Sequence, residues 1–290
     1  MSPPYLFLHW RSGTEIRRVS AFSSPPRNMH ARATPLSCPV CRAADAREVF
    51  RKEFNVSCNC YFEGRRLYPA NEGCVSYVEC LGCGFLWAPE LHGWDPQTFK
   101  RRIYNEEYAL ADPPFAFERP TRLAAWVARF ARPGMRVLDY GGGEGLLARS
   151  LREVGIDAVS WDPFYDSSGK PAGSFDLVTC FEVVEHVPDQ RRLFFDLASL
   201  SRGGVCVFLT LLRPERLEGD WWYASPRNGH ISLHSATSLR RVCEDVGLAL
   251  HSFSGEVHAM ARTPSQLATL DLPPVTVSGT PEFQLDSRSR

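Results

Sequence analysis

The 290-residue sequence has no long apolar run and no excess of charge of one sign. No stretch approaches the roughly 20 apolar residues of a membrane span, so we expect no membrane partner. Lys plus Arg and Asp plus Glu number 33 each, and a basic field that would favour nucleic acid is therefore absent. The N-terminal apolar patch, residues 5–10, is too short for a signal peptide, which predicts a cytoplasmic protein of one or two domains.

Both ends of the chain lack helical or strand periodicity. Residues 1–36 are rich in Pro, Ser and Arg and carry five Arg against one Glu, so we expect a disordered arm. The same composition fits a targeting peptide, or a start at Met29 instead of Met1. Residues 263–290 are rich in Pro, Ser and Thr and are predicted to be a disordered tail.

Residues 119–262 alternate apolar runs with amphipathic stretches. Strands are expected at 136–140, 158–161, 175–181, 204–211, 248–254 and 257–262, and helices at 145–154, 189–200 and 236–246. This order predicts an α/β domain with a Rossmann-like, mostly parallel sheet, flanking helices and a C-terminal antiparallel strand. A smaller module at residues 37–90 precedes this domain, joined to it by a connecting segment at 91–118.

A glycine-rich loop follows the first predicted strand. Asp139 ends the strand, and Gly141, Gly142, Gly143 and Gly145 lead into a helix. Glycines allow a tight turn and the close approach of a ligand, and the helix N-terminus supplies unpaired N–H donors. The spacing is not that of the dinucleotide-binding motif. An acid at this position would repel a pyrophosphate and favours a ligand with a cationic amino group.

With a second motif at residues 175–189, which contains Glu185 and His186, the chain resembles the class I S-adenosylmethionine-dependent methyltransferases. The resemblance implies that Asp139 and the loop glycines hold the amino-acid end of the cofactor. It also implies that Asp162 accepts both ribose hydroxyls, as a carboxylate can. The other expected cofactor contacts are Pro163, Phe164, Phe181 and Glu182. Residues 163–174 are too few for a helix and a strand, so a third strand should be reduced or missing.

Seven of the ten cysteines lie between residues 38 and 83. Two C-x-x-C pairs, Cys38 with Cys41 and Cys80 with Cys83, predict one tetrahedral zinc that is structural, because four thiolates leave no open position. The residues between the pairs should form an insertion closed at its base by the metal. The other three, Cys58, Cys60 and Cys74, would form a second site, substitute for one ligand of the first, or be plain structural or surface cysteines.

The arrangement of a zinc module before a methyltransferase-like domain resembles that of a bacterial subgroup that includes sugar C-methyltransferases. Residues 80–87 and 104–108 carry that part of the resemblance, which covers about residues 37–262. It implies a small-molecule methyl acceptor, with a sugar or nucleotide-linked sugar as a candidate. Two alternatives stay open: an RNA methyltransferase that grips RNA through the zinc module, and a catalytically silent zinc-containing binding module.

The acceptor is expected at residues 221–235, in the loop that leaves the carboxyl end of the predicted strand at 204–211. Trp222 and Tyr223 would stack on a ring or belong to the core. Arg227, like Arg213, would pair with a substrate anion or be solvated.

Three residues are candidates for catalysis. His230 matches a catalytic histidine of the sugar C-methyltransferases, although Gly229 replaces the glutamate that precedes it there. A neutral imidazole could accept a proton from the acceptor, or the residue could fasten the loop. Glu185 and His186, which lie beside the transferred methyl in relatives, are the other two, with bracing of their turn as the alternative.

Overall fold

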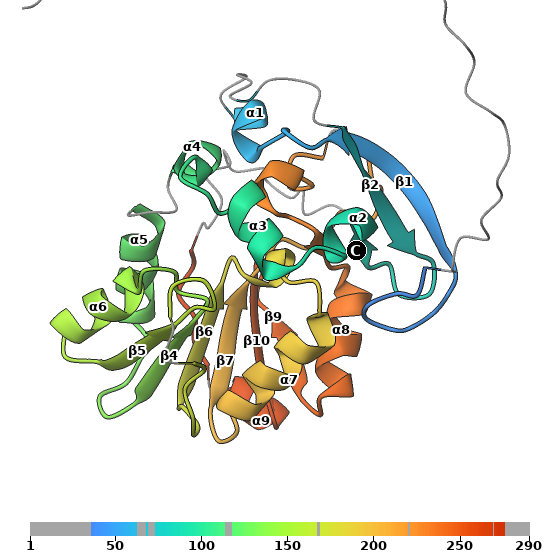
Figure 1. Ribbon diagram of the computed structural model, residues 1–290. Coiled ribbons are helices and arrows are strands. Elements are labelled where there is room, and N and C mark those ends of the chain that lie inside the picture. Colours follow the sequence, from blue (N-terminus) through green and yellow to red (C-terminus); the bar gives the residue numbers. More distant parts are fainter. Residues whose placement is uncertain are drawn as a thin grey trace, which may run out of the picture. The chain divides into compact units, whose positions relative to one another are not determined.

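The computed structural model describes residues 36–62, 68, 73–113, 118–166, 169–219, 221–268 and 270–275 (Figure 1). Nearly all of the predicted N-terminal arm, and the chain beyond residue 275, lie outside the described residues. None of the described helices is long and apolar enough to span a bilayer.

The larger of two sheets has six strands in the order β5-β4-β6-β7-β10-β9. These are β4 (Arg136–Tyr140), β5 (Asp157–Trp161), β6 (Leu177–Phe181), β7 (Val205–Leu209), β9 (Ala249–Ser252) and β10 (Val257–Ala261). The first four run parallel, and β10 is antiparallel to both β7 and β9. The predicted Rossmann-like class is confirmed.

Helices cover both faces of this sheet. Successive strand residues point to opposite faces, so Val137 and Leu177 pack with α5 (Glu118–Val127) and α6 (Leu146–Glu153). Leu138 and Val178 pack with α7 (Gln190–Leu200) and α8 (Ala236–Asp245) on the other side. Burial on both faces explains why β6 is apolar or small at every position.

The expected loss of a third strand is also confirmed within the described residues. β5 is an edge strand, and no further strand lies in the described parts of the chain between β5 and β6.

The predicted N-terminal module shares its sheet with the larger domain. β1 (Ala46–Glu53), β2 (Cys74–Cys80), β3 (Leu86–Trp87) and β8 (Ser232–Leu233) form an antiparallel sheet in that order. β8 comes from the loop after β7. Core residues Phe85 and Trp87 lie in one cluster with Phe194 of α7. The prediction of a separate module at residues 37–90 is therefore wrong, because the hairpin and the larger domain bury one continuous core.

The predicted connecting segment is mostly helical. It contains α2 (Pro89–His92), α3 (Pro96–Arg102) and α4 (Tyr108–Ala111), and α1 (Cys58–Phe62) precedes them. Figure 1 shows α3 beside the ends of the sheet strands. Apolar residues such as Phe99 and Ile103 anchor this segment in a third core cluster.

The predicted tail is structured at its start. Residues Pro264–Ala268 form α9, and the Trp126 Nε1–H donates to the Pro273 carbonyl at 2.7 Å. Leu270 and Leu272 pack against the cluster that contains α5. The disorder expected from residue 263 is therefore wrong as far as residue 275, because these apolar side chains cover an otherwise exposed core.

Candidate active site

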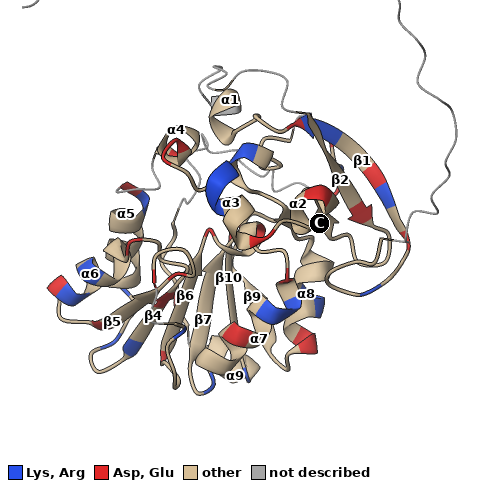
Figure 2. Cartoon of the chain, viewed as in Figure 1, with Lys and Arg blue, Asp and Glu red and all other residues tan. Residues whose placement is uncertain are grey.

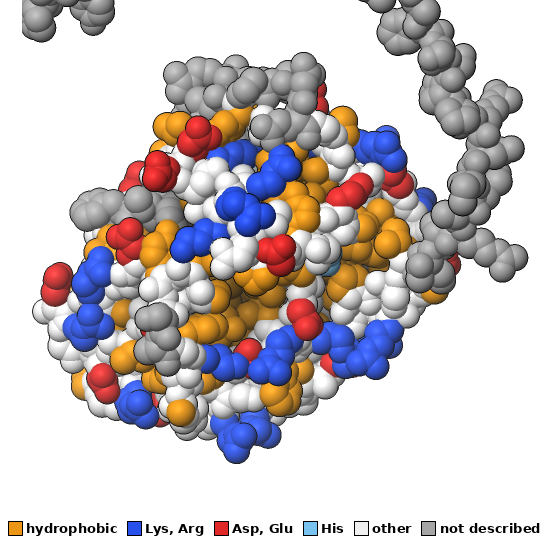
Figure 3. Space-filling model, viewed as in Figure 1, with side chains coloured by type: hydrophobic (Ala, Val, Ile, Leu, Met, Phe, Trp, Pro, Cys, Tyr) orange, Lys and Arg blue, Asp and Glu red, His pale blue; other side chains and the backbone are white. Residues whose placement is uncertain are grey.

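A cavity of about 690 Å³ opens at the carboxyl ends of β4 and β6. That volume lies within the range of small-ligand sites. Figure 3 shows a hollow bordered by hydrophobic side chains. The lining includes the glycine loop and Asp162. It also includes many aromatic side chains, among them Trp94, Phe99, Tyr104, Tyr108, Trp222 and Tyr223.

The glycine loop has a shape that only glycine supports. Gly141, Gly143 and Gly145 have φ of 76°, 55° and 74°, in the left-handed region. A Cβ at Gly142 would overlap the side-chain oxygens of Asp139 and Ser160. The loop from residue 141 to 143 lines the cavity, whereas Gly145 caps α6 outside the lining residues.

Asp139 lies beneath the loop. Its carboxyl group is 3% exposed and accepts hydrogen bonds from Thr179 Oγ1 at 3.3 Å and Ser160 Oγ at 3.4 Å. Burial raises the pKa of Asp139 to about 7. The group therefore fixes the loop to two neighbouring strands, while its contact with a cofactor stays a prediction.

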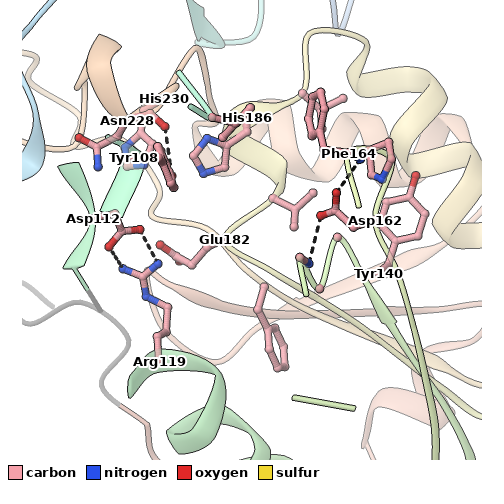
Figure 4. Close-up of a pocket in the computed structure, with 18 of the residues that line it drawn as sticks. Tyr108, Asp112, Arg119, Tyr140, Asp162, Phe164, Glu182, His186, Asn228 and His230 are labelled. Atoms are coloured by element: carbon pink, nitrogen blue, oxygen red, sulfur yellow. Dashed lines mark hydrogen bonds and ion pairs between the residues drawn. The ribbon is translucent and has the colours of Figure 1, made fainter. Parts of the chain in front are cut away.

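Asp162 is held in place by two backbone donors. Gly143 N–H donates to Oδ2 at 3.1 Å and Phe164 N–H to Oδ1 at 2.8 Å (Figure 4). Each carboxylate oxygen keeps a further lone pair. The side chain can therefore still accept two hydroxyl groups. Pro163 and Phe164 line the same end of the cavity.

Two histidines face the middle of the cavity with one ring nitrogen each free to accept. His186 Nδ1 lies 3.1 Å from the Gly229 carbonyl, and His230 Nδ1 lies 2.7 Å from the Tyr223 carbonyl. A carbonyl only accepts, which assigns the proton to Nδ1 and the lone pair to Nε2. Burial lowers the pKa of both imidazoles, so they are neutral at pH 7.

The turn that carries His186 also carries two glutamates. Glu182 has φ of 55°, unusual for a residue with a side chain, and it lines the cavity between Arg119 and His186 (Figure 4). Burial raises the pKa of Glu182 well above its usual value. Glu185 is fully buried in the 3-10 turn Val184–His186, with Oε1 3.8 Å from His186 Nε2.

The sequence from 115 to 252 matches a family model described as a methyltransferase domain. The chain carries a methyltransferase domain. The match includes the glycine loop, Asp162 and both histidines, and the resemblance to the class I methyltransferases is thereby confirmed.

Among curated relatives, the ubiquinone biosynthesis O-methyltransferase of Xanthomonas campestris pv. campestris (strain B100) is 34% identical over 118 residues. The aligned part is 32% of this chain and 49% of the relative, and the protein of that name from Xanthomonas axonopodis pv. citri gives the same values. The chain thus spans about half the length of these relatives. A solved structure of magnesium protoporphyrin IX methyltransferase from Synechocystis PCC 6803 has 18% identity, a TM-score of 0.40, and covers 58% of this chain and 95% of its own.

Two of the three residues predicted to contact the acceptor, Trp222 and Tyr223, line the cavity, and so does Phe181. Their contact with a substrate stays a prediction. Arg227 is not among the lining residues. It is 2% exposed, and its guanidinium donates to the Ile103 carbonyl at 3.0 Å and to Asn105 Oδ1 at 3.1 Å. Both expectations for Arg227, substrate contact and solvation, are wrong, because this arginine joins the 221–235 loop to the segment after α3.

Arg213 likewise has an internal partner. Its Nη2 donates to Glu79 Oε1 at 2.8 Å and its Nε to the Gly84 carbonyl at 2.6 Å. The arginine therefore holds β2 and the second cysteine pair against the methyltransferase domain.

The sequence analysis missed an ion pair in the cavity wall. Arg119 and Asp112 form two hydrogen bonds of 2.8 Å each. Both residues line the cavity, next to Tyr108. Residues 104–108 are part of the subgroup pattern described above, but that pattern does not place them at a cavity. Asp112 and Arg119 gave no signal, because they fall in or beside the segment expected to be a plain connection.

The two C-x-x-C pairs meet. Cys38 Sγ lies 3.7 Å from Cys83 Sγ, and Cys41 Sγ lies 3.5 Å from Cys80 Sγ. All four sulfurs lie within 4.8 Å of one another. Zinc–sulfur bonds of about 2.3 Å in a tetrahedron require sulfurs about 3.8 Å apart, so the geometry fits zinc. The three other cysteines are apart from this cluster: Cys58 lines the cavity, Cys60 contacts Ser57, and Cys74 is exposed.

Proposed function

We propose that the protein transfers a methyl group from S-adenosylmethionine to a hydroxyl oxygen of a small, ring-bearing molecule. One observation carries the proposal: the glycine loop, Asp162, His186 and His230 all line one cavity. Methyl transfer needs donor and acceptor aligned with water excluded, and such positioning supplies most of the acceleration. The cavity provides a place for each partner.

The cofactor end fits S-adenosylmethionine through its own residues. Asp162 would accept the ribose hydroxyls, Phe164 and Pro163 would border the adenine, and the N–H groups and Cα atoms of the loop would face the amino-acid part. The bound cofactor supplies a methyl group on a sulfonium. The chain holds this group in line with the acceptor and keeps water away.

The acceptor end favours a ring. Tyr104, Tyr108, Trp222 and Tyr223 offer aromatic faces, which stack on planar or apolar rings. The named relatives act in ubiquinone biosynthesis, whereas the zinc-module resemblance implies a sugar or nucleotide-linked sugar. Phenols and sugars are therefore the two acceptor classes to test. RNA is disfavoured because acidic and basic residues are interspersed in Figure 2 and the net charge is zero.

A structural zinc at Cys38, Cys41, Cys80 and Cys83 is part of the proposal. The spacing of the four sulfurs supports it. The metal would fix the base of the β1–β2 hairpin and the position of β3, which pairs with β8 beside the cavity.

The change Asp162→Ala tests the cofactor end. It removes acceptors for two hydroxyls, and hydrogen bonds to a charged group are worth about 1.5–3 kcal/mol, so the affinity for S-adenosylhomocysteine should fall about tenfold or more. Titration calorimetry measures this, with Asp157→Ala, 68% exposed on β5, as the control. Equal affinity in wild type and Asp162→Ala would refute the ribose assignment. An assay that follows transfer of a labelled methyl group from the donor to phenols or to sugars then identifies the acceptor class.

A further inference from the structure

A second set of metal-ligand atoms lies at the cavity wall, where His186 and His230 line the cavity and Glu185 is buried beside them. Glu185, His186 and His230 each offer one nitrogen or oxygen, and these atoms lie within 4.8 Å of one another. Two imidazoles and one carboxylate form a donor set that suits divalent transition metals. The set is different in kind from the four thiols, which suit zinc and other soft ions.

Glu185 gives an independent indication. Its side chain is 0% exposed, and among the described residues neither carboxylate oxygen has a hydrogen-bond partner. An unpaired buried carboxylate is strongly destabilising, and native proteins keep such groups where a partner or metal compensates them. The turn that holds it is fixed, because Ile231 N–H donates to the Glu185 carbonyl at 2.9 Å. The carboxylate is therefore held rigidly beside His186 Nε2, at 3.8 Å.

Both histidines are oriented in the manner of metal ligands. The other ring nitrogen of a metal-bound histidine usually donates to a carbonyl or carboxylate, which fixes the ring. Here the carbonyls of Gly229 and Tyr223 take that role. The two rings lie edge to face with centroids 5.0 Å apart, and Figure 4 shows the two side chains next to each other.

Gly229 contributes to this arrangement. Its φ is 85°, and a Cβ there would lie 3.2 Å from His186 Nδ1 and 3.2 Å from the Tyr104 hydroxyl. A glutamate at this position, as in the sugar C-methyltransferases, would press on His186 and Tyr104. The replacement noted in the sequence thus makes room for His186.

We propose that Glu185, His186 and His230 bind one divalent transition-metal cation of the Mn²⁺ or Co²⁺ type. Three protein ligands leave coordination positions for an acceptor oxygen. This role of the cation rests on the proposed function, whereas its binding does not.

The cation would activate the acceptor. It lowers the pKa of a bound hydroxyl, whose proton leaves to solvent. An oxygen lone pair then forms the bond to the methyl carbon, while the carbon–sulfur bond breaks and its electron pair neutralises the sulfonium. In this reaction His230 is a ligand and not the general base.

Manganese binding to the full chain tests the site, because Mn²⁺ favours oxygen and nitrogen over thiolates. Electron paramagnetic resonance, with and without S-adenosylhomocysteine, should count about one Mn²⁺ per chain. His230→Asn and Glu185→Gln should each weaken its binding at least about tenfold, because even changes to residues that only hydrogen-bond a metal ligand cost about 10–100-fold. His251→Asn, on an exposed residue of β9, is the matched control and should leave affinity unchanged.

A spectroscopic measurement on the wild type keeps the test independent of how the variants fold. Co²⁺ should give the weak visible bands of nitrogen and oxygen ligation, in addition to any thiolate charge-transfer band. Absence of bound Mn²⁺ with and without S-adenosylhomocysteine overturns the site, and so does undiminished binding by both variants. Cofactor binding without Mn²⁺ would overturn only this inference. Mn²⁺ binding without cofactor binding would support the site and refute the proposed methyl transfer.

Discussion

Replacement of Gly142 by alanine should damage the cofactor end more than its small size suggests. A Cβ at this position would overlap Asp139 Oδ2 and Ser160 Oγ and would lie 2.6 Å from Asp139 Cγ, about 0.8 Å closer than an ordinary contact of 3.4 Å. Asp139 is 3% exposed and bonded to Thr179. The carboxyl group therefore has little room to retreat, and the loop has to shift instead.

The size of the effect follows from that overlap. Overpacking of a buried site costs about 1–3 kcal/mol, and for a domain of this size each kcal/mol lowers the melting temperature by roughly 2–4 °C. When an element that positions a ligand is shifted by about 1 Å, turnover can fall about 10²-fold. We expect Gly142→Ala to melt several degrees lower and to bind S-adenosylhomocysteine at least about tenfold more weakly.

Thermal melting and titration calorimetry measure both quantities, and Gly203→Ala is the matched control. Gly203 is exposed, and a Cβ there meets no atom within 4 Å, so this variant should behave like the wild type. If Gly142→Ala keeps the melting temperature and cofactor affinity of Gly203→Ala, then the loop is not the rigid cradle described above.

Two further results are expected. Elemental analysis should find about one zinc per chain in the wild type and less in Cys80→Ser, whereas Cys60→Ser, whose thiol lies outside the four-sulfur cluster, should keep the full content; equal zinc in both variants would exclude the site. The buried Asp139 carboxyl, with its pKa raised to about 7, keeps its proton in the folded state at pH values where the unfolded chain has lost it. The free energy of unfolding of the wild type should therefore fall relative to Asp139→Asn as pH rises from about 4 to about 7. Denaturant titrations measure this. If the free energies of unfolding of the two proteins change with pH in parallel over that range, Asp139 is ionised throughout.

The central sheet could be predicted from the sequence, because each of its strands is a short apolar run with a turn signal after it. The expected strand at 136–140 coincides with β4, and the short segment after Asp162 correctly indicated the missing strand. β8 has only two residues, too few to show a period, so its pairing with β3 could not be foreseen. The start of the tail was misjudged because its few apolar residues are widely spaced.

The site was predictable where it depends on one local motif. The glycine loop and Asp162 lie within one strand–turn–helix unit and the next strand, and they face one cavity as expected. The meeting of His186 with His230 depends on the path of the 221–235 loop, which is set by contacts with residues 86–108. Arg227 was misassigned for the same reason, since its partners Ile103 and Asn105 come from a segment without a recognisable pattern.

The pairing of β3 with β8 limits how this protein can be re-engineered or diversified. Backbone pairing of Leu86 with Leu233 and of Trp87 with Ser232 attaches the cysteine-bearing hairpin to the loop that carries His230. A chimera that exchanged only the N-terminal residues, or only the loop, would lose the register between them. The two segments should therefore be inherited and transplanted together, as one discontinuous unit.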